Sequence, residues 1–425
     1  MSLQLNISPE RMVRLRQFDI SKMYIYSKRN VAMICFYLGM AIVYFGSLHP
    51  WFLWPMKELY VVPASGFLLL SYLTSNSMEK TIFDRKQFIM PLLAYIILSY
   101  YIIMVGNQNV NAYIINLFSI FVFFLLFIVN NHELQKLATF LCKAMALLLI
   151  PSIGFFVLYI IGLPLPSVNA VYGDNLYSFS NYFFFMIDDR SLTILIPRFQ
   201  SVFLEPGHLG SATTLLLMTQ MGNWKRWWNV ILIIASVISF SLAAYAILIV
   251  LIFLGLWTQR KNIFSKIILS TVLLFTVGII ATYYNGGDNL VNNLILARME
   301  IDERSGEMVG NNRVDENFER EFDKFITTSD AFLGRDMSKI PHGTGNSGYR
   351  VFIYQNGLIG LLLVVLLYIF SFKGYHDFRY LVSAIIISLL IFWIRGYPLW
   401  YSNFIPILAT AYQSHSKQKV QHSGL

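Results

Sequence analysis

The sequence predicts an all-α polytopic membrane protein with about 12 transmembrane helices. Hydrophobic residues make up 56% of the 425 residues and charged residues only 13%, whereas an ordinary soluble domain carries about 25% charged residues. A chain with so little polar surface cannot face water on all sides, so lipid must surround most of it. The basic residues lie mostly between the apolar runs. These observations exclude a soluble globular protein.

A membrane-spanning helix needs about 20 apolar residues, and the candidate spans can be placed in order along the chain. They are, in approximate numbers, 31–49, 58–75, 88–105, 112–129, 144–163, 207–222, 228–240, 242–257, 266–284, 349–372, 379–394 and 397–413. The seventh and eighth are the least distinct, because only Ser239-Phe240-Ser241 interrupts a nearly continuous apolar run. Joining them into one span would invert the sidedness of everything that follows.

The distribution of Lys and Arg predicts the side of the membrane that each connection faces. With a cytoplasmic N-terminus, 20 of the 32 basic residues lie on the cytoplasmic side and 12 on the other side, as the positive-inside rule expects. We therefore expect both termini in the cytoplasm. The N-terminal arm at 1–30 is basic and lacks a signal-peptide cleavage pattern, and the tail occupies 414–425.

Two long elements are then expected on the outer face of a single integral membrane domain, 1–425. The segment 164–206 contains prolines and aromatic clusters and is interpreted as a partly membrane-associated loop. The segment 285–348 is a larger loop that contains an amphipathic helix on or near the membrane surface. That helix is predicted by apolar residues at helical spacing among charged ones: Val314, Phe318, Phe322 and Phe325.

Several kinds of chemistry find no support in the sequence. It lacks a nucleotide-binding Gly-rich loop and an H-E-x-x-H motif, and its outer histidines have no metal-ligand spacing, so we expect neither a cofactor nor a metal site. Cys35 and Cys142 lie in or beside apolar runs and are expected to pack there rather than to form a disulfide. The net charge of +9 does not indicate nucleic-acid binding, because no basic stripe is interleaved with stacking aromatics.

The first candidate site lies at the outer end of the predicted span 207–222. Arg198 precedes the turn Glu205-Pro206-Gly207-His208, and ionisable groups at membrane depth are costly and usually functional. Pro206 suits a first helical turn, and the positive end of the helix favours a carboxylate just before it. The alternative is that Glu205 only caps the helix and pairs with Arg198, but capping does not explain His208.

The second candidate site is the segment 331–350, which leads into the predicted span 349–372. Glycines and a proline surround His342, and Arg335 and Arg350 flank it. Glycine lets the backbone approach a ligand closely, and a guanidinium presents two parallel donors to phosphate oxygens. The segment therefore fits a pyrophosphate-binding loop. The alternative is a surface turn with an ordinary solvated histidine.

Taken together, these features resemble the bacterial O-antigen polymerase and ligase superfamily. The resemblance covers about residues 198–372. It rests on the Glu205-Pro206-Gly207 turn, on the outer loop with Gly334 and His342, and on the helix that contains Gln355-Asn356-Gly357. It implies a class C glycosyltransferase of the bacterial inner membrane with a periplasmic active site. The implied donor and acceptor are both undecaprenyl-diphosphate-linked glycans.

The resemblance also implies roles for individual residues. Arg198 and Glu205 match the arginine and the acid of the Glu-Pro turn, Arg313 matches the arginine that opens the amphipathic helix, and His342 matches the loop histidine. Catalysis would then use three residues: His342, Glu205 and Arg198. Four others would bind the diphosphate or glycan: Arg313, Arg335, Arg350 and His208. The reaction would be metal-independent and inverting, with His342 favoured over Glu205 as the general base because its pKa lies near neutrality.

More than one activity fits the resemblance. Many ligases carry a Ser-Arg-Gly step where this chain has Ser241-Leu242-Ala243-Ala244. Its absence favours a polymerase of repeat units over a ligase that transfers a finished glycan to lipid A core, with Arg335 or Arg350 supplying the charge. A lipid-linked oligosaccharide flippase is a further alternative. Flippases, however, consist of two similar halves, and this sequence shows no similarity between its halves. A polymerase would need a separate chain-length regulator as a partner, and its product is O-antigen, capsule or another exopolysaccharide.

Overall fold

The computed structural model describes residues 29–75, 82–83, 87–106, 110–173, 177–189, 196–258, 316–335 and 348–413, with isolated positions between 268 and 283. The described chain is mostly helical. Five of its helices are long and apolar enough to cross a membrane: Arg29–Gly46, α4 (Val110–Ile128), α5 (Asn131–Ile160), α12 (Tyr349–Phe372) and α13 (Phe378–Arg395). Three shorter helices are also apolar: α3 (Ile89–Val105), α7 (Trp227–Ile238) and α8 (Leu242–Thr258). This is the architecture of a multi-pass membrane protein.

The remaining helical elements have 4 to 15 residues each. They are the 3-10 helix η1 (Trp51–Tyr60), α2 (Val61–Ser75), α6 (Pro206–Met218), α10 (Glu316–Ile326), α11 (Asp330–Leu333) and α14 (Tyr401–Ala411). The predicted break at Ser239-Phe240-Ser241 is confirmed, because α7 ends before it and α8 begins after it. Phe240 there has a φ of 45°, which no regular helix contains. The predicted span 266–284 lies largely outside the described residues, as do the arm 1–30, apart from its last two residues, and the tail 414–425.

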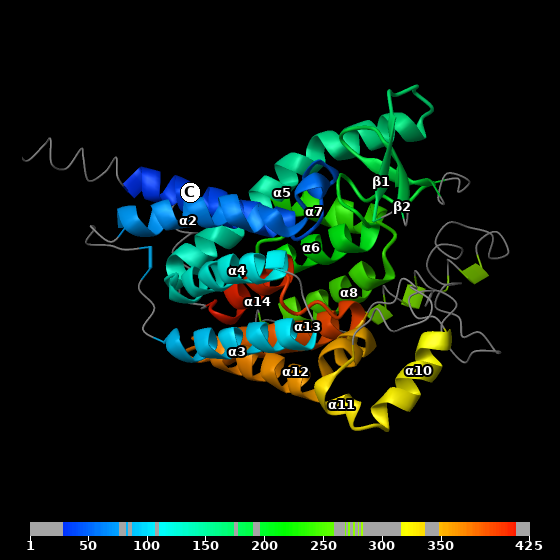
Figure 1. The fold of residues 1–425 in the computed structure, drawn as a ribbon. Helices are drawn as coiled ribbons and strands as arrows, with labels where there is room; N and C mark the ends of the chain where they lie inside the picture. Colours follow the sequence, from blue (N-terminus) through cyan, green and yellow to red (C-terminus); the bar gives the residue numbers. More distant parts are fainter. Residues whose placement is uncertain are drawn as a thin grey trace, which may run out of the picture.

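The helices run side by side, and the connections between them gather at two opposite ends (Figure 1). At one end, Trp51 N–H donates to Val202 O at 3.0 Å, and Ser402 N–H donates to Ser47 Oγ at 3.0 Å. At the other end, Asn131 contacts His376 at 2.9 Å, and Arg379 donates to Thr258 O at 3.3 Å. The second end carries the basic residues Lys136, Lys225, Arg226, Lys373 and Arg379. We call the first, which carries the sheet described next, the sheet end.

The segment 164–206 differs from the predicted loop, and the fold is therefore not purely α-helical. It contains a three-stranded antiparallel sheet of β1 (Val168–Tyr172), β2 (Tyr177–Asn181) and β3 (Met186–Asp188), in the order β1-β2-β3. The residues of β2 alternate aromatic and polar side chains, and Phe179 is fully buried between exposed or half-buried neighbours. That two-residue period is typical of a strand. The sheet lies at one end of the bundle, near the end of α5 (Figure 1).

Large apolar side chains lie on the outside of the bundle as well as in its core. Leu73 on α2, Leu117 on α4 and Leu362 on α12 are each 57–67% exposed, whereas Leu68, Leu126 and Leu367 on the same helices are fully buried. Contiguous apolar surface of this kind is rare on soluble monomers. Lipid is the environment that such a surface requires.

The predicted amphipathic helix is present as α10, within the described part of the loop 285–348. Phe318, Phe322 and Phe325 are buried against the first turns of α12, and the Phe325 and Tyr354 rings are 4.7 Å apart. The prediction of a helix is confirmed, and the structure adds that α12 is its packing partner. The apolar face of α10 therefore holds this helix against the start of α12.

The helix α12 is interrupted, which the continuous apolar pattern did not predict. Gly357 has a φ of 62° and a ψ of −175° inside it, a conformation that favours glycine. The backbone groups released by the break are bound by neighbouring elements. Arg335 N–H donates to Tyr354 O at 2.7 Å, and the Tyr101 hydroxyl of α3 lies 3.0 Å from Asn356 O.

Replacing Phe325 by Ala is expected to detach α10 from α12. The ring is fully buried, and truncating a buried Phe costs about 3–5 kcal/mol of stability. Hydrogen exchange of the backbone amides of 316–326 should rise strongly in Phe325→Ala. The adjacent Ile326 is 41% exposed, so Ile326→Ala serves as the matched control and should change little. Equal exchange in the two variants would show that the aromatic contacts do not hold α10.

Candidate functional site

Glu205 is the residue on which the sheet-end contacts converge. It has an extended backbone (φ −141°, ψ 146°) and is followed by Pro206 at the first position of α6. It occupies the N-cap position of α6, but its side chain makes no capping hydrogen bond to the helix. Its Oε2 instead lies 3.1 Å from Nη1 of Arg395, and its Oε1 accepts a hydrogen bond from the Tyr177 hydroxyl at 3.3 Å. Strand β2 and helix α13 therefore both position this carboxylate.

Arg395 is the central cation of this site, and the sequence analysis did not identify it. It lies in the last turn of α13, where the negative end of the helix favours a cation. Gly396, with a φ of 67°, ends the helix. Arg395 is only 4% exposed. Among the described residues, its Nε and Nη2 have no hydrogen-bond partner, which is unusual for the donors of a buried guanidinium.

Gly207 makes room for Arg395. A Cβ atom at Gly207 would overlap the guanidinium, with Cζ only 2.6 Å away. The guanidinium therefore lies directly over the first turn of α6, whose positive end is unfavourable for a cation. The carboxylate of Glu205 offsets this repulsion. The Glu-Pro-Gly turn thus supplies a counter-ion, a helix start and the space for Arg395.

Two histidines and a tryptophan form an aromatic layer beside Glu205. His208 is 6% exposed, and its Nε2 lies 3.8 Å from Glu205 Oε2. Its ring centroid is 5.0 Å from Trp400 and 6.1 Å from His49. Burial lowers the pKa of His49, an effect that the nearby charge of Glu205 opposes. The structure therefore brings His208 together with Glu205 as predicted, and adds His49 and Trp400.

Arg198 lies in the same outer segment, beside α8. Phe199, the next residue, donates its N–H to Ile238 O at 3.2 Å. Arg198 is close enough to α8 to interact electrostatically with the Tyr245 hydroxyl. Arg198 is half-buried. The chain from Arg198 to Glu205 contacts the sheet as well, since Ser201 O accepts from Met186 N–H at 2.9 Å. Arg198 is thus held at the sheet end.

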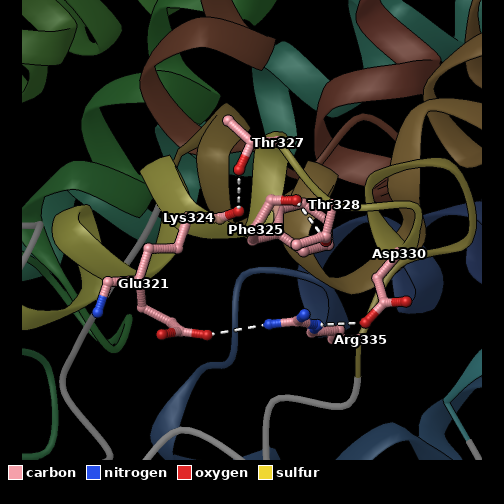
Figure 2. Close-up of polar contacts among 7 residues, drawn as sticks. All are labelled: Glu321, Lys324, Phe325, Thr327, Thr328, Asp330 and Arg335. Carbon is pink, nitrogen blue, oxygen red and sulfur yellow. Dashed lines mark hydrogen bonds and ion pairs between the residues drawn. The ribbon is translucent and has the colours of Figure 1, made fainter.

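Arg335 and Arg350 are engaged with acidic residues of the outer helices. Arg335 Nε lies 2.7 Å from Asp330 Oδ2 and its Nη1 lies 3.0 Å from Glu321 Oε1, as Figure 2 shows. The hydrogen bond that Arg335 donates to Asp330 raises the pKa of the guanidinium. Arg350 pairs with Glu319 of α10. These pairs hold α10 and α11 to α12, so both arginines have a structural role besides the diphosphate role predicted for them.

His342 and Arg313 lie outside the described residues. The described chain resumes at Gly348, and a Cβ at Gly396 would lie 3.2 Å from Gly348 Cα. The loop that carries His342 therefore rejoins the bundle beside the residue that follows Arg395. Among the described residues, no group of three or more His, Cys, Asp or Glu side chains is placed to hold a metal ion.

Comparison with known proteins adds no relative to this description. No family model matches the chain, and neither a curated protein nor a solved structure was found to be similar to it.

Proposed function

We propose that the protein polymerises undecaprenyl-diphosphate-linked oligosaccharide repeat units at the periplasmic face of the bacterial inner membrane. The observation that carries this proposal is the buried Arg395. Its guanidinium keeps two nitrogens without a partner among the described residues, beside an acid and a histidine at the end of a multi-pass bundle. A lipid diphosphate combines an anionic head with an apolar tail, and it fits an arginine at a membrane boundary.

The reaction would be a single displacement at the anomeric carbon of the donor glycan. A hydroxyl of the acceptor repeat unit forms the new C–O bond while the bond from that carbon to the diphosphate breaks. The proton passes to a general base, for which His342 remains the first choice and Glu205 the second. The carrier departs as undecaprenyl diphosphate. Guanidinium groups stabilise its developing charge.

Arg395 is better suited than Arg335 or Arg350 to stabilise the charge that develops on the departing diphosphate. Arg335 and Arg350 have carboxylate partners on the outer helices, whereas Arg395 has donors to spare. We therefore assign the main diphosphate contact to Arg395 and a supporting contact to Arg198. Arg313 remains a proposed diphosphate ligand. Because Glu205 pairs with Arg395, its role is to position the guanidinium, and His208 supports that carboxylate.

Deleting the gene in its native host is expected to leave single repeat units on the surface acceptor, seen as the loss of the polysaccharide ladder on a gel. Complementation with Arg198→Ala or His342→Ala should give the same short product at normal protein levels. Arg320 is an exposed residue of α10, so Arg320→Ala is the matched control and should restore the ladder.

Two outcomes would overturn the proposal. Long chains accumulating on the lipid carrier would identify a ligase. If repeat units instead fail to reach the periplasm, the protein is a flippase.

A further inference from the structure

A cavity of about 140 Å³ lies at the sheet end, between η1, α2, α3, α4 and the start of α14. Aromatic rings supply much of its wall, including a stacked pair, Tyr95 and Phe123, whose centroids are 3.8 Å apart. Polar groups interrupt that wall at several points: Ser47, His49, Glu58, Ser119 and the hydroxyl groups of Tyr60 and Tyr401. Polar atoms make up the larger part of the exposed wall, and placed polar groups of this kind fix the orientation of a small ligand.

The Tyr401 hydroxyl is the strongest sign that the cavity holds a ligand. Tyr401 is 6% exposed, and its hydroxyl has no hydrogen-bond partner among the described residues. Ser119 on the same wall interacts with this hydroxyl, but not with the geometry of a normal hydrogen bond. A buried hydroxyl is normally hydrogen-bonded, because its desolvation otherwise costs free energy. A ligand that accepts from Tyr401 would remove this cost.

The chemistry of the wall favours a neutral polyhydroxylated ligand. Glu58 places a carboxylate on the cavity that accepts hydrogen bonds only, and it disfavours an anion there. The hydroxyl groups of Ser119 and Tyr401 can donate as well as accept. Aromatic faces cover the apolar faces of the ligand. A sugar ring, with apolar faces and hydroxyl groups around its edge, matches each of these features.

The cavity adjoins the Arg395 site through two shared residues. His49 and Trp400 line the cavity, and both rings also lie within about 6 Å of His208, which contacts Glu205. The sugar in the cavity is thus separated from Arg395 by this aromatic layer. A donor sugar is bonded directly to its diphosphate and must lie next to the arginine. The cavity is therefore placed for a sugar that carries no phosphate.

We propose that this cavity is a saccharide-binding subsite that holds a sugar of the acceptor repeat unit. Glu58 accepts hydrogen bonds from its hydroxyl groups, and Tyr401 donates one. Saccharide binding stands on the cavity alone, whereas the assignment to the acceptor rests on the proposed function.

Binding to the purified full-length protein in detergent tests the subsite. The first probe is the free repeat-unit oligosaccharide released by mild acid from the host's lipid carrier, titrated by saturation-transfer NMR. Losing one hydrogen bond in Tyr401→Phe, or the charge in Glu58→Gln, should weaken saccharide binding by about fivefold to thirtyfold. The second probe is inorganic pyrophosphate, whose binding should depend on Arg395 and not on these two residues.

The chain offers a matched control for each change. Tyr100 is 62% exposed on α3, and Asp323 is exposed on α10, so Tyr100→Phe and Asp323→Asn should bind the saccharide like the unmodified protein. Thermal unfolding checks that each variant is folded.

The possible outcomes separate the subsite from the proposed function. If saccharide binding is unchanged in both Tyr401→Phe and Glu58→Gln, the subsite is wrong. It is also wrong if the cavity takes tetramethylammonium in place of the saccharide, because aromatic rings and a carboxylate then bind a cation. If saccharide binding is weakened in Tyr401→Phe and Glu58→Gln while pyrophosphate binding does not depend on Arg395, the subsite is supported. The proposed diphosphate site at Arg395 is then wrong.

Discussion

Arg395→Ala is expected to reduce polymerisation by about 100-fold to 1,000-fold, the usual cost of removing one donor that stabilises a developing anion. Arg395→Lys should recover only part of the activity, because an ammonium group keeps the charge but not the planar pair of donors. The measurement is chain elongation by membranes supplied with lipid-linked repeat units. Arg379 lies at the opposite end of the same helix, and Arg379→Ala should remain active. Full activity of Arg395→Ala would exclude a diphosphate contact.

Stability and catalysis can be separated at this ion pair. Removing Arg395 alone leaves the Glu205 carboxylate without this partner, and breaking a buried pair typically costs about 3–5 kcal/mol. That cost should be near the lower end here, because Glu205 is 32% exposed. The double variant Arg395→Met with Glu205→Gln removes both charges and should regain thermal stability. It should stay inactive, since a structural role alone would restore both properties together.

The sequence predicted the parts of the fold that depend on local pattern. Long apolar runs identified α4, α5, α12 and α13, and helical spacing identified α10. The sheet was missed because the aromatic cluster at 182–185 suggested membrane association, although the alternation of aromatic and polar residues at 177–181 is a strand pattern. The break at Gly357 was also missed, because it depends on backbone contacts with Phe332 and Gly334 that a neighbouring element supplies.

Only the part of the candidate site that is continuous in sequence was predictable. The Glu205-Pro206-Gly207-His208 turn is local, and its residue types already indicate a functional helix start. Its partner Arg395 is 190 residues further along the chain. The two meet because α13 packs against α14 and α8, and both of these helices pack against α6. One signal was present in the sequence, since Arg395-Gly396-Tyr397-Pro398 places a charge at the end of an apolar run.

Gly207→Ala is the second change expected to have a large effect, and it tests why the turn contains glycine. The new Cβ would overlap the Arg395 guanidinium. Because the obstructed group is the end of a flexible side chain and not backbone, the fold should persist while the guanidinium is displaced. We expect polymerisation to fall by about 100-fold, close to the effect of losing the donor itself, with thermal stability changed much less than in Arg395→Ala.

Gly154→Ala provides the control for this substitution. Gly154 lies within α5, and a Cβ there would meet no atom within 4 Å, so the change should leave activity intact and stabilise the helix by up to about 1 kcal/mol. The combination of Gly207→Ala with Arg395→Lys supplies the decisive comparison. If Gly207 matters only because it leaves space for the guanidinium, Gly207→Ala should reduce polymerisation far less in the Arg395→Lys variant than in the unmodified protein. The effects of substitutions at residues in contact are not additive. Additive losses of activity would mean that Gly207 acts on the start of α6 itself. The contact with Arg395 would then not explain why this position is a glycine.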